Sequence, residues 1–486
     1  MLYGGAVGKM ILEDISMGLS EEAMRALAVT SIDGRYAKKV ESLAPIVSEK
    51  GLIESRIHVE SQWLLYLDEV LAESGPRLSS AVTGVLKDLQ AGISLEDALE
   101  VKKIEARTNH DVKAVEYFIK QKLQAHGAED HTLAFIHFAC TSEDINNLAY
   151  GLMLDRARNE VMIPAIDSIL GNLIEKIEAY SDLSMLSRTH GQTASPTTLG
   201  KELAVFAHRI YRYRQQLVQL PLEGKMNGAV GNYNAHLVAF AEKDWHALTR
   251  EFVEARLGLR HNPITTQIEN HDSMVDFVSA LNRIHTILIG LSRDIWSYIS
   301  INYFGQKTVA GEVGSSTMPH KVNPIDFENA EGNLGVASGI AEHFAAKLPI
   351  SRWQRDLSDS TVQRVMGTYL GHSLLGLSSL LKGLKKIHPK VEVITADLEA
   401  AAEVLAEPIQ TVMRRYGISD AYEKLKAETR GQSVSRDSLV KVIDACQELP
   451  EVEKLRLKEL TAKAYTGSAK DLAMSVVANL RSGGLG

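Results

Sequence analysis

The sequence predicts a mainly α-helical protein built around a central bundle of long helices. Three observations support this prediction. Apolar residues recur at helical spacing over long stretches, alternation with a period of two residues is scarce, and some stretches are apolar on more than one side. Helices of this kind are typical of bundles in which each helix packs against several neighbours.

The helical stretches follow one another through the middle of the chain. The first apolar stripe runs from Ile166 to Ile177, after Pro164 at a position that the first turn of a helix accepts. The longest covers 273–300 without a proline, and at 1.5 Å per residue it would be about 40 Å long. Similar patterns predict helices over 201–220, 325–348 and 361–387.

Two polar breaks suggest how the chain divides. Residues 126–130 (HGAED) precede the apolar run at Leu133, and His388-Pro389 follows the last long helical stretch. We therefore expect an N-terminal extension at 1–30, an N-terminal helical domain at 31–130, a central helical bundle at 131–388 and a C-terminal helical domain at 389–486.

Composition excludes several classes of protein. The chain has 486 residues with 53 Lys+Arg and 61 Asp+Glu, a net charge of −8, which disfavours binding to nucleic acid or to an anionic membrane. Two cysteines fit a reducing compartment, and we find no run of about 18 apolar residues that would span a bilayer. The first thirty residues include Glu13 and Asp14 and lack the pattern of a targeting peptide. We expect a cytoplasmic protein.

The most informative polar segment is 311–324 (GEVGSSTMPHKVNP). Its glycines allow backbone N–H groups to approach a ligand, Lys321 adds a positive charge, and Pro324 stands at a helix start that favours an anion. These features predict an anion-binding loop with hydroxyl groups in its middle. A flexible linker followed by a capped helix would have the same composition.

Three further segments contain residues that suit acid–base chemistry or carboxylate binding. Residues 187–192 (SRTHGQ) hold His190, whose imidazole titrates near neutral pH, although a loop histidine that hydrogen-bonds locally would look the same. For 107–113 (RTNHDVK) the alternative is a solvated helix start capped by Asn109. In 140–147 (CTSEDINN) the hydroxyl side chains could hold a carboxylate or serve only as helix caps.

Positive charge comes from a turn at 33–36 (DGRY) and from 351–364 (SRWQRDLSDSTVQR). Ser360 and Arg364 are four residues apart and would share a helix face. Arginine and serine suit a phosphate group, which the guanidinium can hold with two hydrogen bonds. The alternative is a salt-bridge network with the aspartates of the same segment.

No nucleotide, zinc or nucleophile motif occurs in the chain. It lacks G-x-G-x-x-G after a strand, a Walker phosphate loop, H-E-x-x-H and G-x-S-x-G. His137 and Cys140 are three residues apart, but no partner pair supports a zinc site. We expect neither a cofactor nor a metal.

Residues 314–324 (GSSTMPHKVNP) resemble the signature of the fumarase/aspartase superfamily of lyases. The resemblance narrows to the adenylosuccinate lyase family, and 325–333 (IDFENAEGN) looks like its longer bacterial type. It extends from about Ser31 into the C-terminal domain, through 405–410. The segments that narrow it are 33–36, 108–117, 141–147 and 188–192.

The resemblance implies an all-α, three-domain subunit in a homotetramer whose central helices form one shared bundle, with each active site built from three subunits. The implied reaction is the β-elimination of fumarate from adenylosuccinate to give AMP. The same site would split the succinylamino-carboxamide ribotide SAICAR to AICAR. The implied partner is therefore a small nucleotide substrate, without a cofactor.

The resemblance also assigns the catalytic roles. Ser315 is the base that removes a proton from carbon, and loop amides together with Lys321 would stabilise its alkoxide. His190 is the general acid that protonates the leaving nitrogen. Glu328 would keep His190 oriented and charged, and His110 helps to bind or polarise the substrate.

The remaining family matches are substrate-binding residues. Some match contacts to the nucleotide and its phosphate, and others match groups around the succinyl carboxylates and the closing loop. They are Arg35, Tyr36, Asn109, His110, Asp111, Thr141, Ser142, Gln267, Ser316, Lys321, Val322, Asn323, Asn329, Arg355, Ser360, Thr361, Val362, Gln363 and Arg364.

Two alternatives compete with this interpretation. A sister lyase would act on argininosuccinate, fumarate or aspartate, but these substrates carry no phosphate for Arg35, Arg355 and Arg364 to bind. A catalytically silent helical scaffold would not need to keep Ser315 and His190 together with Lys321 and Glu328.

Overall fold

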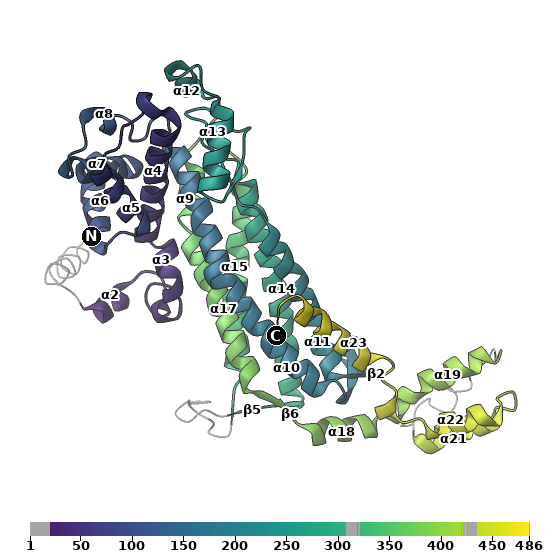
Figure 1. Ribbon diagram of the computed structural model, residues 1–486. Coiled ribbons are helices and arrows are strands. Elements are labelled where there is room, and N and C mark those ends of the chain that lie inside the picture. The colour runs from purple at the N-terminus through teal and green to yellow at the C-terminus, as the bar shows by residue number, and fades with distance from the viewer. Residues whose placement is uncertain are drawn as a thin grey trace. The chain divides into compact units, whose positions relative to one another are not determined.

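The computed structural model describes residues 20–307, 318, 321–418, 420, 423 and 435–485. This part of the chain is mainly helical, as predicted, and its strands form three two-stranded sheets (Figure 1). The chain divides into two compact, interleaved units. The first contains Met1–Ala165, Arg214–Thr286 and Gly332–Gly376, and the second contains Ile166–Tyr213, Ile287–Glu331 and Leu377–Gly486.

The first unit is built from helices of very different lengths and one short parallel pair of strands, β3 (Glu223–Gly224) and β4 (Arg260–His261). Its helices are α2 (Glu21–Leu27), α3 (Ala44–Val47), α4 (Glu49–Leu71), α5 (Ser80–Ala91), α6 (Leu95–Thr108), α7 (Asp111–Ala125), α8 (Asp130–Leu133), α9 (Ser142–Arg156), α12 (Asn234–Ala239), α13 (Trp245–Glu251) and α16 (Ser358–Gln363). Short 3₁₀ turns cover Ala37–Lys39, Glu41–Leu43 and Ala72–Ser74, and π-helical turns cover Ala157–Met162 and Phe252–Arg256.

An aromatic cluster on α4 forms part of the core of the first unit. Trp63 is fully buried, its ring centroid lies 4.9 Å from that of Phe252, and its indole N–H donates to the carbonyl of Phe138 at 3.0 Å. The helix begins at a serine cap, because the side chain of Ser48 accepts the N–H of Gly51. Burial of large rings, with their polar atoms bonded, fixes α4 against its neighbours.

The second unit contains two antiparallel strand pairs and the C-terminal helices. One pair is the hairpin of β1 (Ser184–Thr189) and β2 (Gln192–Thr198), and the other joins β5 (Phe304–Gln306) to β6 (Ile387–Pro389). The C-terminal core is apolar, with Ile409, Met413 and Leu439 each at most 2% exposed. Its helices are α18 (Val391–Ala400), α19 (Ala406–Arg415), α21 (Arg436–Ala445), α22 (Glu451–Glu459) and α23 (Ala469–Ser482), with 3₁₀ turns at Ala402–Leu405 and Ala462–Ala464.

Five long helices contribute residues to both units, and the sequence predicted most of their course. The apolar stripes at 164–177, 201–220, 273–300 and 325–348 are confirmed as helices. The prediction for 361–387 is wrong in one respect: the chain forms two helices, because a turn at Val365 bonds its N–H to the carbonyl of Val362 and separates them. The five are α10 (Ile163–Tyr180), α11 (Leu199–Gln219), α14 (Asp272–Ser300), α15 (Ile325–Lys347) and α17 (Met366–Lys386).

Helix α14 is also long and apolar enough, by composition alone, to cross a membrane, with a mean hydropathy of 1.3 over its best window. However, 56% of that window is buried inside the protein. Phe277, Leu281, Leu288 and Leu291 on its stripe are fully buried. A core helix has this same composition, since it must be apolar to pack on several sides.

The hairpin at 184–198 was not predicted, because its strands lack an alternation of apolar and polar residues. The predicted boundaries at residues 30, 130 and 388 stay a prediction. Each compact unit combines three separate stretches of the chain, so the units do not correspond to consecutive domains.

Candidate active site

A pocket of about 500 Å³ in the first unit brings together ten of the predicted substrate-binding residues. They arrive from four separate segments: the junction of α6 and α7, the start of α9, the segment before α14, and α16 with the loop before it. Glu105, Asn146 and Leu357 complete the lining, and the sequence had not singled them out. The ten are Asn109, His110, Asp111, Thr141, Ser142, Gln267, Arg355, Ser360, Thr361 and Arg364.

The junction of α6 and α7 presents its polar side chains through a sharp turn. Asn109 ends α6 in the left-handed region, at φ +52°, which asparagine tolerates better than most residues. His110 then caps α7, since its Nδ1 accepts the N–H of Lys113 at 3.2 Å. The alternative in which Asn109 caps the second helix is therefore wrong, and His110 does so.

The start of α9 is held from inside the protein. The carboxylate of Asp144 accepts the N–H of Thr141 at 2.8 Å, which fixes the turn that carries Thr141 and Ser142 into the pocket. The same carboxylate accepts the N–H of Asn227 at 3.0 Å and pairs with the ammonium of Lys225. Thr141 is the N-cap residue of α9 and Ser142 is its first residue, and both line the pocket.

Asp111 joins two arginines at the edge of the pocket. Its Oδ2 lies 2.7 Å from Nη2 of the buried Arg56 and 3.1 Å from Nη2 of Arg364. Burial alone would raise the pKa of Asp111, but the charge of Arg56, the N–H of Val112 and the charge of Arg364 together hold the pKa below its usual value. Asp111 is therefore a fixed anion that positions arginines.

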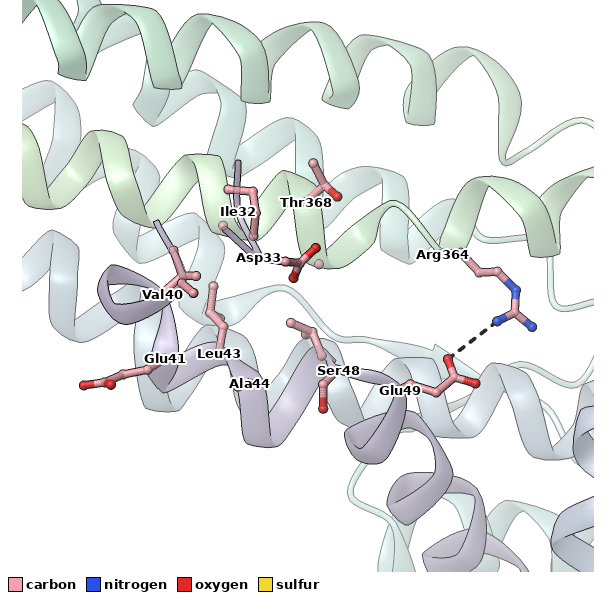
Figure 2. A pocket seen from close by; sticks show the side chains of 14 residues that line it. Ile32, Asp33, Val40, Glu41, Leu43, Ala44, Ser48, Glu49, Arg364 and Thr368 are labelled. Carbon is pink, nitrogen blue, oxygen red and sulfur yellow. Dashed lines mark ion pairs between the residues drawn. The ribbon is translucent and has the colours of Figure 1, made fainter. Parts of the chain in front are cut away.

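A neighbouring pocket of about 390 Å³ shares Arg364 with the first (Figure 2). Figure 2 shows Glu49 paired with Arg364, at 3.7 Å between Oε2 and Nη1, while Asp33 lies elsewhere on the wall. The guanidinium of Arg364 thus stands between two cavities and is held by a carboxylate on each side.

Four predicted binding residues of the first unit do not line the 500 Å³ pocket, namely Arg35, Tyr36, Val362 and Gln363. Arg35 packs beside the ring of Tyr36, 6.0 Å from its centroid. The side chain of Gln363 points into the interior, where its amide lies 3.3 Å from Nδ1 of His271. Val362 precedes it in α16. Their predicted contacts with substrate stay predictions.

His190 lies at the tip of the β1–β2 hairpin in the second unit. Thr189 pairs with Gln192, so His190 and Gly191 form a two-residue turn, with φ values of +53° and +76°. Positive φ at both positions is typical of a type I′ turn, and it projects the exposed imidazole from the hairpin. Arg188, two residues before His190, forms an ion pair with Asp397 on α18, with 2.6 Å between Nη2 and Oδ2.

The remaining predicted catalytic residues also belong to the second unit or lie outside the described residues. Ser315 and Ser316 lie outside them. Lys321, Val322 and Asn323 precede α15, and the side-chain amide of Gln306 donates to the carbonyl of Val322 at 2.9 Å.

Glu328 and Asn329 stand in the first turns of α15. The carboxylate of Glu328 accepts the indole N–H of Trp296 at 3.1 Å. Within one chain this carboxylate does not contact His190, so the predicted contact between them stays a prediction.

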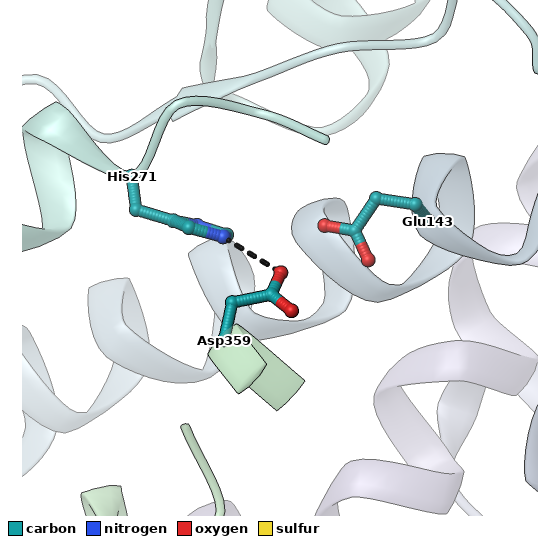
Figure 3. A group of neighbouring side chains, drawn as sticks. All are labelled: Glu143, His271 and Asp359. Carbon is teal, nitrogen blue, oxygen red and sulfur yellow. Dashed lines mark hydrogen bonds and ion pairs between the residues drawn. The ribbon is translucent and has the colours of Figure 1, made fainter. Parts of the chain in front are cut away.

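Three buried side chains behind the first pocket were missed by the sequence analysis. Glu143, His271 and Asp359 are at most 2% exposed, and their polar atoms lie within 4.8 Å of one another (Figure 3). Burial raises the pKa of Glu143 to about 7, although the charges of His271 and Arg355 oppose this. Burial would also lower the pKa of His271, but its bond to Asp359 and the charges of Glu143 and Glu269 raise it overall.

These three are the group whose atoms, within the described ranges, are close enough together to hold a metal ion. The imidazole of His271 is already engaged, because Nε2 lies 3.2 Å from Asp359 Oδ2 and Nδ1 faces the amide of Gln363. Glu143 faces the guanidinium of Arg355 at 3.5 Å. His271 is therefore paired with Asp359, and Glu143 beside them is paired with Arg355. Glu143 and Asp359 stand in the polar segments 140–147 and 351–364 singled out above, whereas His271 stands in a stretch without a motif.

Two family models match most of the chain. Residues 34–339 match the model described as lyase, and residues 351–466 match the one described as adenylosuccinate lyase C-terminal. Among curated proteins, the adenylosuccinate lyase of Escherichia coli (strain K12) is 51% identical over 91% of this chain and 97% of its own length. The adenylosuccinate lyase of Vibrio cholerae is 50% identical over 92% of this chain and 98% of its own.

Two solved structures share the fold at low identity. The 3-carboxy-cis,cis-muconate lactonizing enzyme from Pseudomonas putida has a TM-score of 0.72 and 18% identity, and covers 91% of this chain and 97% of its own. The β-carboxy-cis,cis-muconate cycloisomerase from Acinetobacter calcoaceticus has a TM-score of 0.69 and 15% identity, over 90% of this chain and 98% of its own. They bear out the predicted helical fold class.

Proposed function

The chain belongs to the adenylosuccinate lyase family, and from this premise we propose that it removes fumarate from adenylosuccinate by β-elimination to give AMP. The same chemistry applied to SAICAR gives AICAR. Both substrates are small nucleotides, and the reaction needs no cofactor. The two free cysteines of the chain fit a reducing compartment, and we assign the enzyme to the cytoplasm.

The proposal is supported by one observation about the residues of this chain. Ten binding residues expected from the family resemblance come from four separate segments and line one pocket of about 500 Å³. The pocket joins guanidinium groups of Arg355 and Arg364 to the hydroxyl groups of Ser360 and Thr361. This combination of side chains suits a phosphate group. It therefore favours a nucleotide substrate over succinate-type substrates that carry no phosphate.

The other side of the pocket suits the succinyl part of the substrate. Thr141 and Ser142 offer hydroxyl groups at the start of α9, where the helix dipole favours a carboxylate. Gln267 offers an amide, whose Nε2 donates to the carbonyl of Ala229 at 2.8 Å and whose Oε1 faces Arg355. We assign these groups to the carboxylates of the substrate.

The chemical step transfers one proton from carbon and one proton to nitrogen. We assign Ser315 as the base that removes the proton from the carbon beside a carboxylate. The electron pair of that C–H bond forms the double bond of fumarate, and the C–N bond breaks as its pair moves to the nitrogen. His190 donates a proton to that nitrogen, a role worth about 10²–10⁴ in rate.

Charge develops on the substrate carboxylate while the proton leaves. Lys321 and the loop amides would stabilise that charge and the alkoxide of Ser315, and preorganised donors of this kind are worth about 10²–10³ in rate each. We assign Glu328 to orient His190, and His110 to bind or polarise the substrate. Ser316, Val322, Asn323 and Asn329 would belong to the closing loop and its surroundings.

The assembly we propose is a homotetramer with each site built from three subunits. The binding pocket belongs to the first unit, whereas His190, Lys321 and Glu328 belong to the second. Long helices with apolar surface on several sides support such an assembly, since exposed apolar faces gain stability when subunits cover them.

The direct test incubates the purified protein with adenylosuccinate and measures AMP and fumarate. We expect equal molar amounts of both products. Ser315→Ala and His190→Ala should each abolish turnover and keep the oligomer size of the wild-type protein. A variant with near wild-type rate would remove its residue from the mechanism.

Mixing the two inactive variants tests the shared site. If subunits exchange, hybrid tetramers contain some sites with both Ser315 and His190, and activity should return. No recovery under conditions in which labelled subunits demonstrably exchange would argue against sites built from several chains.

A further inference from the structure

Glu143 is a buried carboxylate immediately behind the substrate pocket. Its side chain is 2% exposed at the start of α9, next to Ser142, whose side chain lines the pocket. Its Oε1 has no hydrogen-bond partner among the described residues. A buried polar atom without a partner costs about 1–3 kcal/mol, so such an atom calls for an explanation.

The charged partner of Glu143 is Arg355. Oε2 of Glu143 lies 3.5 Å from Nη1 of Arg355, and the same Nη1 lies 3.4 Å from Oε1 of Gln267. Arg355 lines the pocket and is 19% exposed at its side chain. Its guanidinium therefore stands between an interior anion on one side and the substrate cavity on the other.

An imidazole and a second carboxylate lie beside Glu143. The polar atoms of Glu143, His271 and Asp359 lie within 4.8 Å of one another, and Figure 3 shows the imidazole of His271 bonded to Asp359 while the carboxylate of Glu143 faces them. Glu143 therefore faces the positive charges of His271 and Arg355 and the negative charge of Asp359, and burial raises its pKa to about 7.

We propose that Glu143 is a positioning residue, which holds the guanidinium of Arg355 toward the substrate's phosphate. This inference rests on the proposed function, since it assigns the phosphate to Arg355. Without the anion behind it, the guanidinium is free to turn away from the cavity, and each binding event must then restrain a mobile side chain.

The first experiment compares Glu143→Gln with wild-type protein in the steady-state cleavage of adenylosuccinate. The substitution keeps the shape and removes the charge. We expect KM to rise about tenfold, as for the loss of one charge-assisted contact, while kcat changes less than about threefold. Thermal unfolding of the same samples should show a folded variant. A KM within twofold of wild type in a folded variant overturns the proposal.

Glu269→Gln is the matched control. Glu269 is equally buried, at 3% exposed, and contacts His271 and Asn262 but not Arg355. Its substitution should lower thermal stability and leave KM unchanged. An equal rise of KM in this control would mean that general loosening around His271 raises KM, and the proposal would fail.

Two further measurements identify Arg355 as the intermediary. In an Arg355→Lys background, Glu143→Gln should add little to KM, because the geometry that it controls is already lost; a full additional factor contradicts the proposal. The ratio of the KM values of Glu143→Gln and wild type should grow from about pH 6 to about pH 8, as Glu143 ionises. The groups that face Glu143 across this range are His271, Asp359, Arg355 and Lys225.

Binding of inorganic phosphate separates this inference from the proposed function. Calorimetric titration of wild type and Glu143→Gln with phosphate should show weaker binding to the variant, whether or not the protein cleaves adenylosuccinate. Equal binding overturns the inference, and absent fumarate release overturns only the proposed function. If Glu143→Gln does not fold, Glu143→Asp, which keeps the charge farther from Arg355, should give a smaller rise in KM, and an unchanged KM again overturns the inference.

Discussion

Lys225 Nζ lies 2.9 Å from Asp144 Oδ1, and neither side chain has any exposed surface. Nζ also donates to the carbonyl of Gly228 at 3.1 Å, and Asp144 accepts the N–H groups of Thr141 and Asn227. The pair thus connects the start of α9 to the loop after β3. A buried ion pair is stable only if both ions are also hydrogen-bonded, and these two are.

We expect Lys225→Met to lower the free energy of unfolding by about 3–5 kcal/mol, because it leaves the carboxylate of Asp144 buried without its counter-ion. Urea or thermal unfolding at a fixed protein concentration measures this. Lys102→Met is the control, since Lys102 is 40% exposed in its pairs with Glu49 and Glu105 and should cost about 0–1 kcal/mol. Equal effects of the two variants would contradict this account.

Arg56 should control substrate affinity without touching substrate. Its Nε donates to Asn146 at 2.9 Å and its Nη2 to Asp111 at 2.7 Å, and a lysine makes only one of these bonds. We expect Arg56→Lys to raise KM for adenylosuccinate about tenfold or more. Arg156→Lys, which alters an exposed pair with Glu160, is the control and should leave KM unchanged. An unaltered KM in Arg56→Lys would show that substrate binding does not require the two simultaneous hydrogen bonds of the guanidinium.

Two substitutions at the tip of the β1–β2 hairpin test the chemistry of His190 and the geometry of the turn separately. At φ +53° asparagine is tolerated better than alanine, so His190→Asn should keep the turn and the melting temperature. We expect kcat to fall by about 10²–10⁴ when the imidazole is lost. Gly191→Ala, at φ +76° with open space around the new Cβ, should instead lower stability by about 1 kcal/mol. A His190→Asn variant with normal kcat would exclude the imidazole as the acid.

His285 should make the protein less stable in acid. It is fully buried near the ring of Tyr369, its ring nitrogens have no partner among the described residues, and burial lowers its pKa to about 3. In the unfolded chain the imidazole of His285 binds a proton near pH 6.5, whereas in the folded chain it stays neutral down to about pH 3. The free energy of unfolding therefore falls as the pH drops from 6.5 toward 3.

The loss that His285 causes is at most about 1.4 kcal/mol per pH unit. Comparing the free energy of unfolding of wild type and His285→Leu at several pH values tests this. The substitution should flatten the acid side of the profile. Parallel profiles for the two proteins would rule out His285 as the cause.

The local pattern of the sequence was enough to predict the positions of most long helices and several residues of the binding pocket. The apolar stripes of α10, α11, α14 and α15 are consequences of helical period, and their ends coincide closely with the prediction. Polar segments at helix starts marked Thr141, Ser142 and His110, because caps and ligand-binding groups need the same side chains. The predicted single helix at 361–387 was wrong because one turn at Val365 leaves no trace in an apolar pattern.

Only the tertiary structure decided which of these segments meet. Arg56, Lys225 and His271 stand in stretches with no motif. Their partners Asp111, Asp144 and Asp359 lie far away in the sequence, so no local pattern predicts these pairs. Burial gives them their importance: a charge removed from water must find a partner, and the fold determines which partner is within reach. Sequence periodicity reports which face of a helix is apolar, whereas the pairing of buried charges depends on the packing of whole helices.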